Sequence, residues 1–455
     1  MTETETIPAP TAESAARRAR IRSGLVRRHR SEWAFRICGI GAVLITLALV
    51  ATLFAQVLGK GLPAFTQAVL HLQVTFDEKI VTAGPAPERA DHGSAAEYEA
   101  AFLDWRRALA GVNWNGLIQH AVQEVAPGFS GEARDIRALV DNNAGLVLRH
   151  MFQDDPDLIG KRVDVDLLAS ADADNWLKGT IDRDLPDARQ QLSAATRALA
   201  DRLHERGIIT MDFAWHIFTN TDSRTAPASA GLSGALVGSL YMMLVVILFA
   251  VPIGVAGAIY LEEFAPKSRF TDLIEININN LAAVPSIVFG LLGAAVFINY
   301  FRLPISAPLV GGLVLGLMTL PTIIIATRSA LRQVPPSLRQ AALGLGASRM
   351  QMVFHHVLPI TYPGILTATI LGVAQALGET APLLLIGMNA FVADIAVTPM
   401  EPSSALPVQI YLWQGNENRN FFEARTSAAI LVLLGLMIAL NGLAIFLRNR
   451  LQRNT

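Results

Sequence analysis

The chain has 455 residues, of which 52% are hydrophobic and 16% are charged, and its formal net charge is −1. Its basic residues lie mainly beside apolar runs, whereas its acidic residues lie mainly between positions 60 and 224, and this distribution excludes a soluble nucleic-acid-binding protein. The single cysteine, Cys38, excludes a disulfide bond within the chain and a cysteine metal site.

Six uncharged apolar runs are each long enough to cross the hydrocarbon core of a bilayer, which takes about 20 helical residues. They cover residues 37–59, 225–261, 276–301, 303–327, 357–378 and 426–447. We therefore expect an all-α polytopic membrane protein with six transmembrane helices, one at the N-terminus and five after a long insertion.

The N-terminal segment, residues 1–34, becomes strongly basic from Arg17 onward, and the positive-inside bias predicts that it lies in the cytoplasm. The apolar run that follows is too long for a signal peptide and has no small-residue cleavage site close behind it. We expect residues 35–58 to form an uncleaved first transmembrane helix that carries the chain out of the cytoplasm.

Residues 59–230 are expected to form an extracytoplasmic insertion domain with a mainly helical α+β fold, because no complete spanning run lies within them. Helical spacing predicts helices over residues 95–110, 131–152 and 187–206, and residues 163–167 and 208–218 are typical of short strands. Four tryptophans are expected to pack in its core: Trp105, Trp114, Trp176 and Trp215. Its acidic residues do not follow the twelve-residue pattern of a calcium loop, so no metal site is predicted.

Residues 231–450 contain the other five spans, and the charges beside them predict the topology. The third helix is expected at about 273–297, the fourth at 306–327, the fifth at 362–388 and the sixth at 426–447. The segment between the fourth and fifth helices carries several arginines and no acid, so it is predicted to be cytoplasmic, as are both termini.

This cytoplasmic segment is far longer than a simple connection between two helices requires, and a plain loop is the alternative interpretation. Val334-Pro335-Pro336 stops the preceding helix, and Ser337 with Gln340 is expected to form a capping box. Two apolar stripes then predict two short helices, which end before Pro359. The stripes are Leu338, Ala341, Ala342 and Leu345, and Met350, Val353, Phe354 and Val357. We expect residues 332–359 to form a helical elbow that docks a partner protein.

The elbow resembles the EAA motif of ABC importer permeases through Gln340-Ala341-Ala342, Gly346 and Leu358-Pro359, which have the spacing of that motif. Gln340 replaces the usual Glu, and His356 stands where a hydrophobic residue is usual. The resemblance implies a coupling helix that fits a cleft in an ATPase subunit, with these six residues as the coupling site. His355 and His356 lack further ligands at suitable spacing and are interpreted as interfacial residues instead of metal ligands.

Residues 378–384, Gly-Glu-Thr-Ala-Pro-Leu-Leu, are similar to the characteristic segment of PstA-type permeases of phosphate-specific importers, and residues 260–266 and 284–291 also resemble segments of that family. The resemblance covers residues 231–450 and implies a five-helix permease core in the bacterial inner membrane. It further implies a sister permease, PstC, two copies of an ATPase, PstB, and an external phosphate-binding protein, PstS.

A translocation pathway is expected along Ser286, Gln375, Gly378, Glu379 and Thr380. A carboxylate at the centre of a membrane helix costs about 2.5–3.5 kcal/mol, so Glu379 should face the bundle or water. Gly372, Gln375, Ala376 and Glu379 would share one face of a continuous helix. Relatives often carry Arg at the position of Gln375, so the direct phosphate ligands are not assigned.

The chain lacks a phosphate-binding P-loop, so ATP and magnesium are expected on the partner ATPase and no cofactor on this chain. A lone membrane carboxylate offers no acid–base pair, and we expect no catalytic residues and no enzyme activity. Two alternatives stay open: a permease for sulfate, phosphonate or molybdate, and a membrane sensor that uses residues 59–230.

Overall fold

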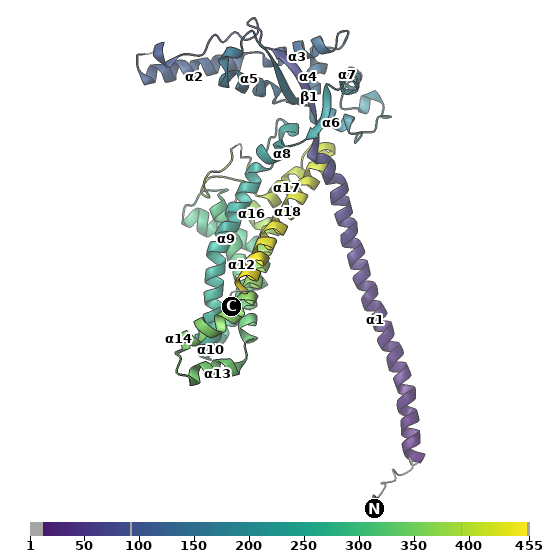
Figure 1. Cartoon of the computed structure of the whole chain (residues 1–455), viewed down its shortest axis with the longest axis vertical. Helices are drawn as coiled ribbons and strands as arrows, with labels where there is room; N and C mark the ends of the chain where they lie inside the picture. Colours follow the sequence, from purple (N-terminus) through teal and green to yellow (C-terminus); the bar gives the residue numbers. More distant parts are fainter. Residues whose placement is uncertain (1–11, 92, 393, 453–455) are drawn as a thin grey trace, which may run out of the picture. The chain divides into compact units, whose positions relative to one another are not determined.

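The computed structural model describes residues 12–91, 93–392 and 394–452 and divides the chain into two compact units, Met1–Gly59 and Lys60–Thr455. In the first unit, α1 (Ala12–Gly61) begins in the basic segment and runs through the first apolar run (Figure 1). Within residues 29–56 of α1 the apolar side chains are exposed, as a helix that contacts lipid requires.

The insertion is built on a three-stranded antiparallel sheet in the order β2-β1-β3. Its strands are β1 (Thr66–Thr75), β2 (Arg162–Leu168) and β3 (Ile209–Phe213). The central strand, β1, was not predicted. Its buried residues Ala68, Leu70, Leu72 and Val74 occupy every second position, and polar residues separate the last three of them. This period of two is the signal in the sequence that indicates the strand.

Short helices cover the sheet and confirm the expected mixture of helices and strands. They are α2 (Ala95–Gly111), α3 (Trp114–Val125), α4 (Ala133–Leu139), α5 (Ala144–Asp154), α6 (Ala171–Leu177), α7 (Ala194–Glu205) and α8 (His216–Thr219). Single turns of 3-10 helix lie at Leu62–Phe65, Arg89–Asp91, Pro156–Leu158, Asp187–Arg189 and Pro227–Ser229.

Three predictions in the insertion need correction. The helix expected over residues 131–152 is two helices, because Val140 leaves the helix to pair with Ala169 in a β-bridge. The helix expected over residues 187–206 begins only at Ala194, where the Ser193 hydroxyl accepts the Thr196 N–H as an N-cap. The strand expected over residues 208–218 ends at Phe213.

The tryptophan prediction was right for three residues and wrong for one. Trp105, Trp114 and Trp176 are buried, but Trp215 is 69% exposed. It follows β3 at the base of the sheet, where its ring lies outside the core of the insertion.

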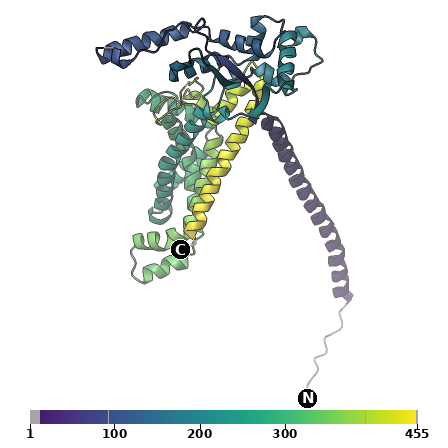
Figure 2. The same cartoon turned by 45° about the horizontal axis from the view of Figure 1, so that its top comes forward.

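The membrane part is a helical bundle whose helices are α9 (Ser233–Ile259), α10 (Arg269–Ala282), α11 (Ser286–Gly293), α12 (Pro308–Arg332), α13 (Pro336–Gly344), α14 (Arg349–Gln351), α15 (Leu358–Gly378), α16 (Ala381–Leu385), α17 (Leu406–Gln414) and α18 (Arg419–Gln452). Three π-helical segments, Tyr260–Phe264, Ala294–Tyr300 and Met352–Val357, extend or join them. Figure 2 shows the same bundle with the insertion at the end away from α13 and α14, and Figure 1 agrees.

Small residues let α9, α12 and α15 pack closely, as is usual between membrane helices. A Cβ atom on Gly254 of α9 would lie 2.8 Å from Ile323 Cγ2 of α12, and one on Gly372 of α15 would lie 2.9 Å from Ile323 Cγ1. Gly364 of α15 meets Ala330 of α12 in the same way. These contacts place α12 in the middle of the bundle.

Within the described residues, five helices are long and apolar enough to span a membrane, and a bent pair makes a sixth if it counts as one span. The bent pair corrects the prediction of a single third helix over residues 273–297. Arg269–Ala282 and Ser286–Tyr300 meet at 101°, because Pro285 separates α10 from α11. The fifth helix also ends earlier than predicted, at Gly378 instead of residue 388.

Candidate functional site

The first candidate site is the elbow between α12 and α15. Proline at the first position of α13 starts that helix, and Gly346 then turns the chain with φ +86°, a value that favours glycine. Ser348 caps α14 through a capping box with Gln351, and the chain continues through the π-helical segment into α15. Val334, Ala342, Val353 and Val357 form the buried inside of the elbow.

The capping box was predicted at the wrong place. Because α13 begins at Pro336, Ser337 already lies inside the helix and makes no capping hydrogen bond. The box belongs instead to Ser348 and Gln351, where the Ser348 hydroxyl accepts the Gln351 N–H at 3.2 Å. The second helix also does not stop before Pro359, because residues Arg349–Gly378 form one helical span of 30 residues.

Of the predicted coupling residues, three lie on the outer surface of the elbow and three hold it together. Gln340, Ala341 and Gly346 are exposed, Ala342 and Leu358 are buried, and Pro359 is half-buried at the start of α15. Leu345, which was expected on the apolar inner stripe, is 91% exposed. It lies at the C-cap of α13, outside the helical stripe, so its side chain projects from the tip of the elbow.

Sequence reasoning missed a network of ion pairs that joins α12 and α13 to the π-helical segment Tyr260–Phe264 and to α10. Arg339 donates to the Glu263 carboxylate from Nη2 at 2.7 Å and to the carbonyl oxygens of Val334 and Leu331 at 2.6 and 2.9 Å. The side chain of Glu263 is 5% exposed and that of Arg339 is 21% exposed. This pair is therefore a largely desolvated clamp with bidentate geometry.

The other pairs of this network are more accessible. Arg328 contacts Glu262 at 3.2 Å and Glu275 at 2.5 Å, and Arg332 contacts Glu262 at 3.0 Å with 59% of its side chain exposed. The sequence carried one signal for the network, since Glu262 and Glu263 end one apolar run and the arginines begin after another. Their pairing required the position of α9 beside α12, which sequence spacing does not specify.

The second candidate site is the break between α15 and α16. Glu379 lies at the C-cap of α15 with extended backbone, φ −84° and ψ 128°, and Thr380 leads into α16. The Glu379 side chain is half-buried and has no hydrogen-bond or ion-pair partner among the described residues. Its carboxylate is thus available to water or to a second chain.

The break at Pro285 lies close to the break at Glu379. A Cβ atom on Gly290 of α11 would lie 2.7 Å from Pro382 Cα, so α11 and α16 touch. Ser286 begins α11 one turn before Gly290, and Thr380 precedes Pro382 by two residues. Ser286 and Thr380, two predicted pathway residues on separate segments, therefore each lie within about one helical turn, 5.4 Å, of the contact between Gly290 and Pro382.

The helical face predicted for this path needs correction. Gly372 and Ala376 are buried, whereas Gln375 and Gly378 are exposed, so these residues do not share one environment. Thr322 of α12 donates its hydroxyl to Gln375 Oε1 at 3.1 Å. Glu379 has left the helix, and the helical count that placed it on that face does not apply to it.

A buried arginine joins the insertion to the start of α18. Arg425 is 2% exposed and donates to the Gln67 side chain, to the carbonyl oxygens of Ala228 and Ala230 and to His216 Nε2 at 2.9 Å. Because a guanidinium only donates, His216 Nε2 must accept, and the ring must be neutral. Burial and the nearby Arg425 charge lower the pKa of His216 to about 3.

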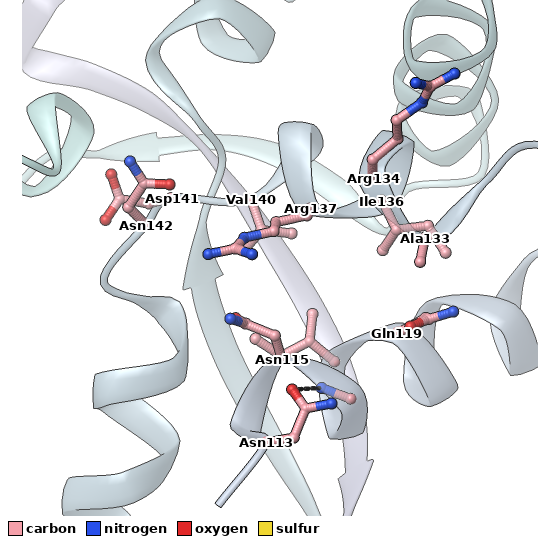
Figure 3. Close-up of a pocket in the computed structure, with 12 residues that line it drawn as sticks. Asn113, Asn115, Gln119, Ala133, Arg134, Ile136, Arg137, Val140, Asp141 and Asn142 are labelled. Carbon is pink, nitrogen blue, oxygen red and sulfur yellow. Dashed lines mark hydrogen bonds between the residues drawn. The ribbon is translucent and has the colours of Figure 1, made fainter. Parts of the chain in front are cut away.

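A hollow of about 300 Å³ lies on the insertion, and Figure 3 shows the side chains from α3, α4 and the following turn that line it. Three polar side chains that line the hollow have no hydrogen-bond partner among the described residues: Asn115, Gln119 and Arg137. Asp141 also lines it, and burial raises the pKa of this carboxyl group. The rim thus combines unused donors with an acid. No group of three or more potential metal ligands occurs in the part of the chain that the structure describes.

Two family descriptions match the chain. Residues 22–187 match a domain of unknown function (DUF3333), and residues 250–454 match the binding-protein-dependent transport system inner membrane component. The second match contains the break at Pro285, the elbow and the break at Glu379.

Curated relatives also match the chain. The chain is 32% identical over 216 residues to the phosphate transport system permease protein PstA of Haemophilus influenzae, covering 47% of this chain and 75% of that protein. It is 30% identical over 224 residues to PstA of Xylella fastidiosa, with 49% and 76% covered. It is 35% identical over 168 residues to the probable ABC transporter permease protein YqgI of Bacillus subtilis, where the match spans 37% of this chain and 56% of the relative.

Among solved structures, the methionine ABC transporter MetNI in an inward-facing conformation matches with a TM-score of 0.37 and 21% identity over 49% of this chain and 94% of that chain. The relatives at 30% identity or more, aligned over three quarters of their length, show the family of the chain. The chain therefore belongs to the PstA-type permeases, multi-pass inner membrane components of binding-protein-dependent ABC transport systems.

Proposed function

We propose that this chain is the transmembrane permease subunit of an ATP-driven importer that carries inorganic phosphate into the cytoplasm. The observation that supports it best is a single helical span, Arg349–Gly378, which joins the exposed elbow directly to the break at Glu379. The transport-component family match includes this span, and relatives of the chain are named phosphate transport permeases.

In this proposal the elbow docks the ATPase. Gln340, Ala341 and Gly346 lie on its outer surface, and Leu345 at its tip exposes an apolar side chain whose burial in a cleft of another protein is favourable. Ala342, Leu358 and Pro359 support that surface from behind. Since the permease contributes no P-loop, ATP and magnesium bind to the ATPase, two copies of a PstB-type subunit.

The translocation path runs along the paired breaks, past Ser286, Gln375, Gly378, Glu379 and Thr380. A carboxylate repels phosphate, so Glu379 does not bind the substrate through its charge. Because it has no partner among the described residues, we assign it to an ion pair or hydrogen bond with the sister permease, PstC. PstS delivers phosphate from the side of the insertion, and both termini of this chain lie in the cytoplasm.

Proteoliposomes that contain this chain, the sister permease and the ATPase, with the binding protein supplied outside, test the proposal. We expect ATP-dependent uptake of labelled phosphate that a tenfold excess of sulfate, phosphonate or molybdate does not inhibit. Uptake of one of these oxyanions in place of phosphate would assign the chain to that substrate, and absence of any ATP-driven uptake would overturn the proposal.

A further inference from the structure

Three exposed aromatic rings and the half-buried ring of Phe65 lie together at the base of the insertion. We name Phe65, Phe213, Trp215 and Phe218 the aromatic cluster. The rings of Phe65, Phe213 and Phe218 are stacked, with centroids 6.0–6.5 Å apart, and Trp215 meets Phe213 edge-on at 4.7 Å. Phe213, Trp215 and Phe218 are 47%, 69% and 37% exposed. These contacts pre-order the rings without covering them.

The cluster lies where membrane spans end. The candidate span His29–Phe65 ends at Phe65 itself, and the next span begins at Ser233. Leu232, directly before that span, donates its N–H to the Ile217 carbonyl at 2.7 Å, which ties the segment of Trp215 and Phe218 to the first turn of α9. The rings therefore lie beside the start of α9, the end of that span away from the elbow.

The packing behind the rings supports the same position. Ala214 and Ile217 alternate with the exposed aromatics and are buried against Leu232, Phe421 and Phe422, at the starts of α9 and α18. The exposed sides of the cluster therefore continue the apolar surface of these spans. Lys60 and Glu423, paired at 2.5 Å, mark the polar boundary nearby.

We propose that the aromatic cluster inserts into the lipid headgroup region of the membrane and fixes the insertion against the outer leaflet. Phenylalanine and tryptophan rings are typical of this region, because each presents an apolar body where the chain leaves the hydrocarbon core. The cluster is continuous with the outer surfaces of membrane spans, which contact lipid, and this favours lipid over a protein partner. This role concerns the insertion and does not depend on which substrate is transported.

Single spin labels on the full chain in phospholipid nanodiscs test the position. The lone Cys38 permits a clean background, Cys38→Ser, in which Trp215→Cys and Phe218→Cys each carry one label. Both positions are exposed, and the labels replace the ring contacts of Trp215 with Phe213 and of Phe218 with Phe65 and Phe213. Leu103→Cys is the matched control, since Leu103 is 51% exposed on α2 and stands outside the cluster.

We expect the labels at residues 215 and 218 to be several-fold more accessible to oxygen than to a water-soluble nickel chelate, relative to the label at residue 103. Equal nickel accessibility at all three positions would show that the cluster faces water and would overturn the proposal. Exclusion of both reagents from residues 215 and 218 would also overturn it, because it would identify a protein interface. Thermal unfolding of each labelled chain confirms that the fold is retained.

Discussion

Replacing Glu263 by Gln removes the negative charge from the Glu263–Arg339 clamp, which holds the elbow to the end of α9. Glu263 is the more buried partner, with 5% of its side chain exposed, and it faces Arg339 across 2.7 Å. Gln keeps the size of the side chain and one acceptor oxygen. The substitution thus tests the ion pair without opening a cavity.

The size of the effect follows from what Arg339 retains. Breaking a fully buried pair by removing one partner costs about 3–5 kcal/mol. Arg339 is 21% exposed and keeps its hydrogen bonds to the Val334 and Leu331 carbonyl oxygens, so the loss should be smaller. We expect about 2 kcal/mol, within the range of a hydrogen bond to a charged group. This corresponds to about a 30-fold rise in the opening equilibrium of the elbow.

Hydrogen exchange of the amides in α13 measures this opening, because local unfolding sets their protection. Coupled phosphate uptake per ATP hydrolysed, in the same proteoliposomes, measures the functional consequence. Arg332→Gln is the matched control. This substitution breaks the ion pair with Glu262, in which the arginine side chain is 59% exposed. It should destabilise the closed elbow by at most about 1 kcal/mol, which corresponds to about fivefold faster hydrogen exchange in α13.

Two results would refute the reasoning. Exchange in Glu263→Gln no faster than in Arg332→Gln would show that the clamp does not stabilise the elbow. Faster exchange with unchanged phosphate uptake per ATP would show that a rigid elbow is not required for coupling.

Three further predictions concern single side chains. Leu345→Asp, at a residue 91% exposed, should abolish co-purification with the ATPase while Ser337→Ala does not, and equal co-purification would remove Leu345 from the docking surface. Glu379→Gln should lower phosphate uptake. It should change the free energy of unfolding by less than about 0.5 kcal/mol, since the substitution removes no partner within the described residues. Uptake at the wild-type rate would show that Glu379 is a packing residue. His216 is neutral in the folded chain because its pKa there is about 3. Below pH 6.5, the ordinary pKa of histidine, the unfolded chain therefore binds one proton more than the folded chain. The free energy of unfolding should fall by about 2 kcal/mol between pH 7 and pH 5. His216→Gln keeps an acceptor for Arg425 and should lose this part of the pH dependence of thermal unfolding; an unchanged dependence would contradict the neutral-histidine assignment.

The membrane spans could be predicted from sequence because a bilayer imposes one simple rule, about 20 apolar residues in a helix. The rule fails at two places. The rule does not detect the 101° bend beside Pro285, because the two helices on either side of the bend together pass as one span. It also does not detect the end of α15 at Gly378. Both failures lie at predicted pathway positions, where local rules are often broken for function.

The site could be predicted only as far as short-range patterns reach. The elbow and its bend at Gly346 follow from residues close in sequence, whereas the capping box predicted for Ser337 and Gln340 does not form. The clamp joins residues 76 positions apart, and the bond from Arg425 to His216 joins residues 209 apart. Spacing in one sequence does not specify such pairs, because they depend on which helices pack together.

The continuous span from Arg349 to Gly378 explains how the two candidate sites can act as one. Its 30 residues measure about 45 Å at 1.5 Å per residue, with the elbow at one end and Glu379 at the other. A helix transmits displacement along its axis, so in the proposed importer a shift of the docked elbow reaches the break at Glu379. The π-helical segment Met352–Val357 interrupts the regular hydrogen bonding beside the elbow, and Gly378 interrupts it beside the break. Movement should therefore concentrate at these two ends while the middle, packed by Gly364 and Gly372 against α12, stays rigid.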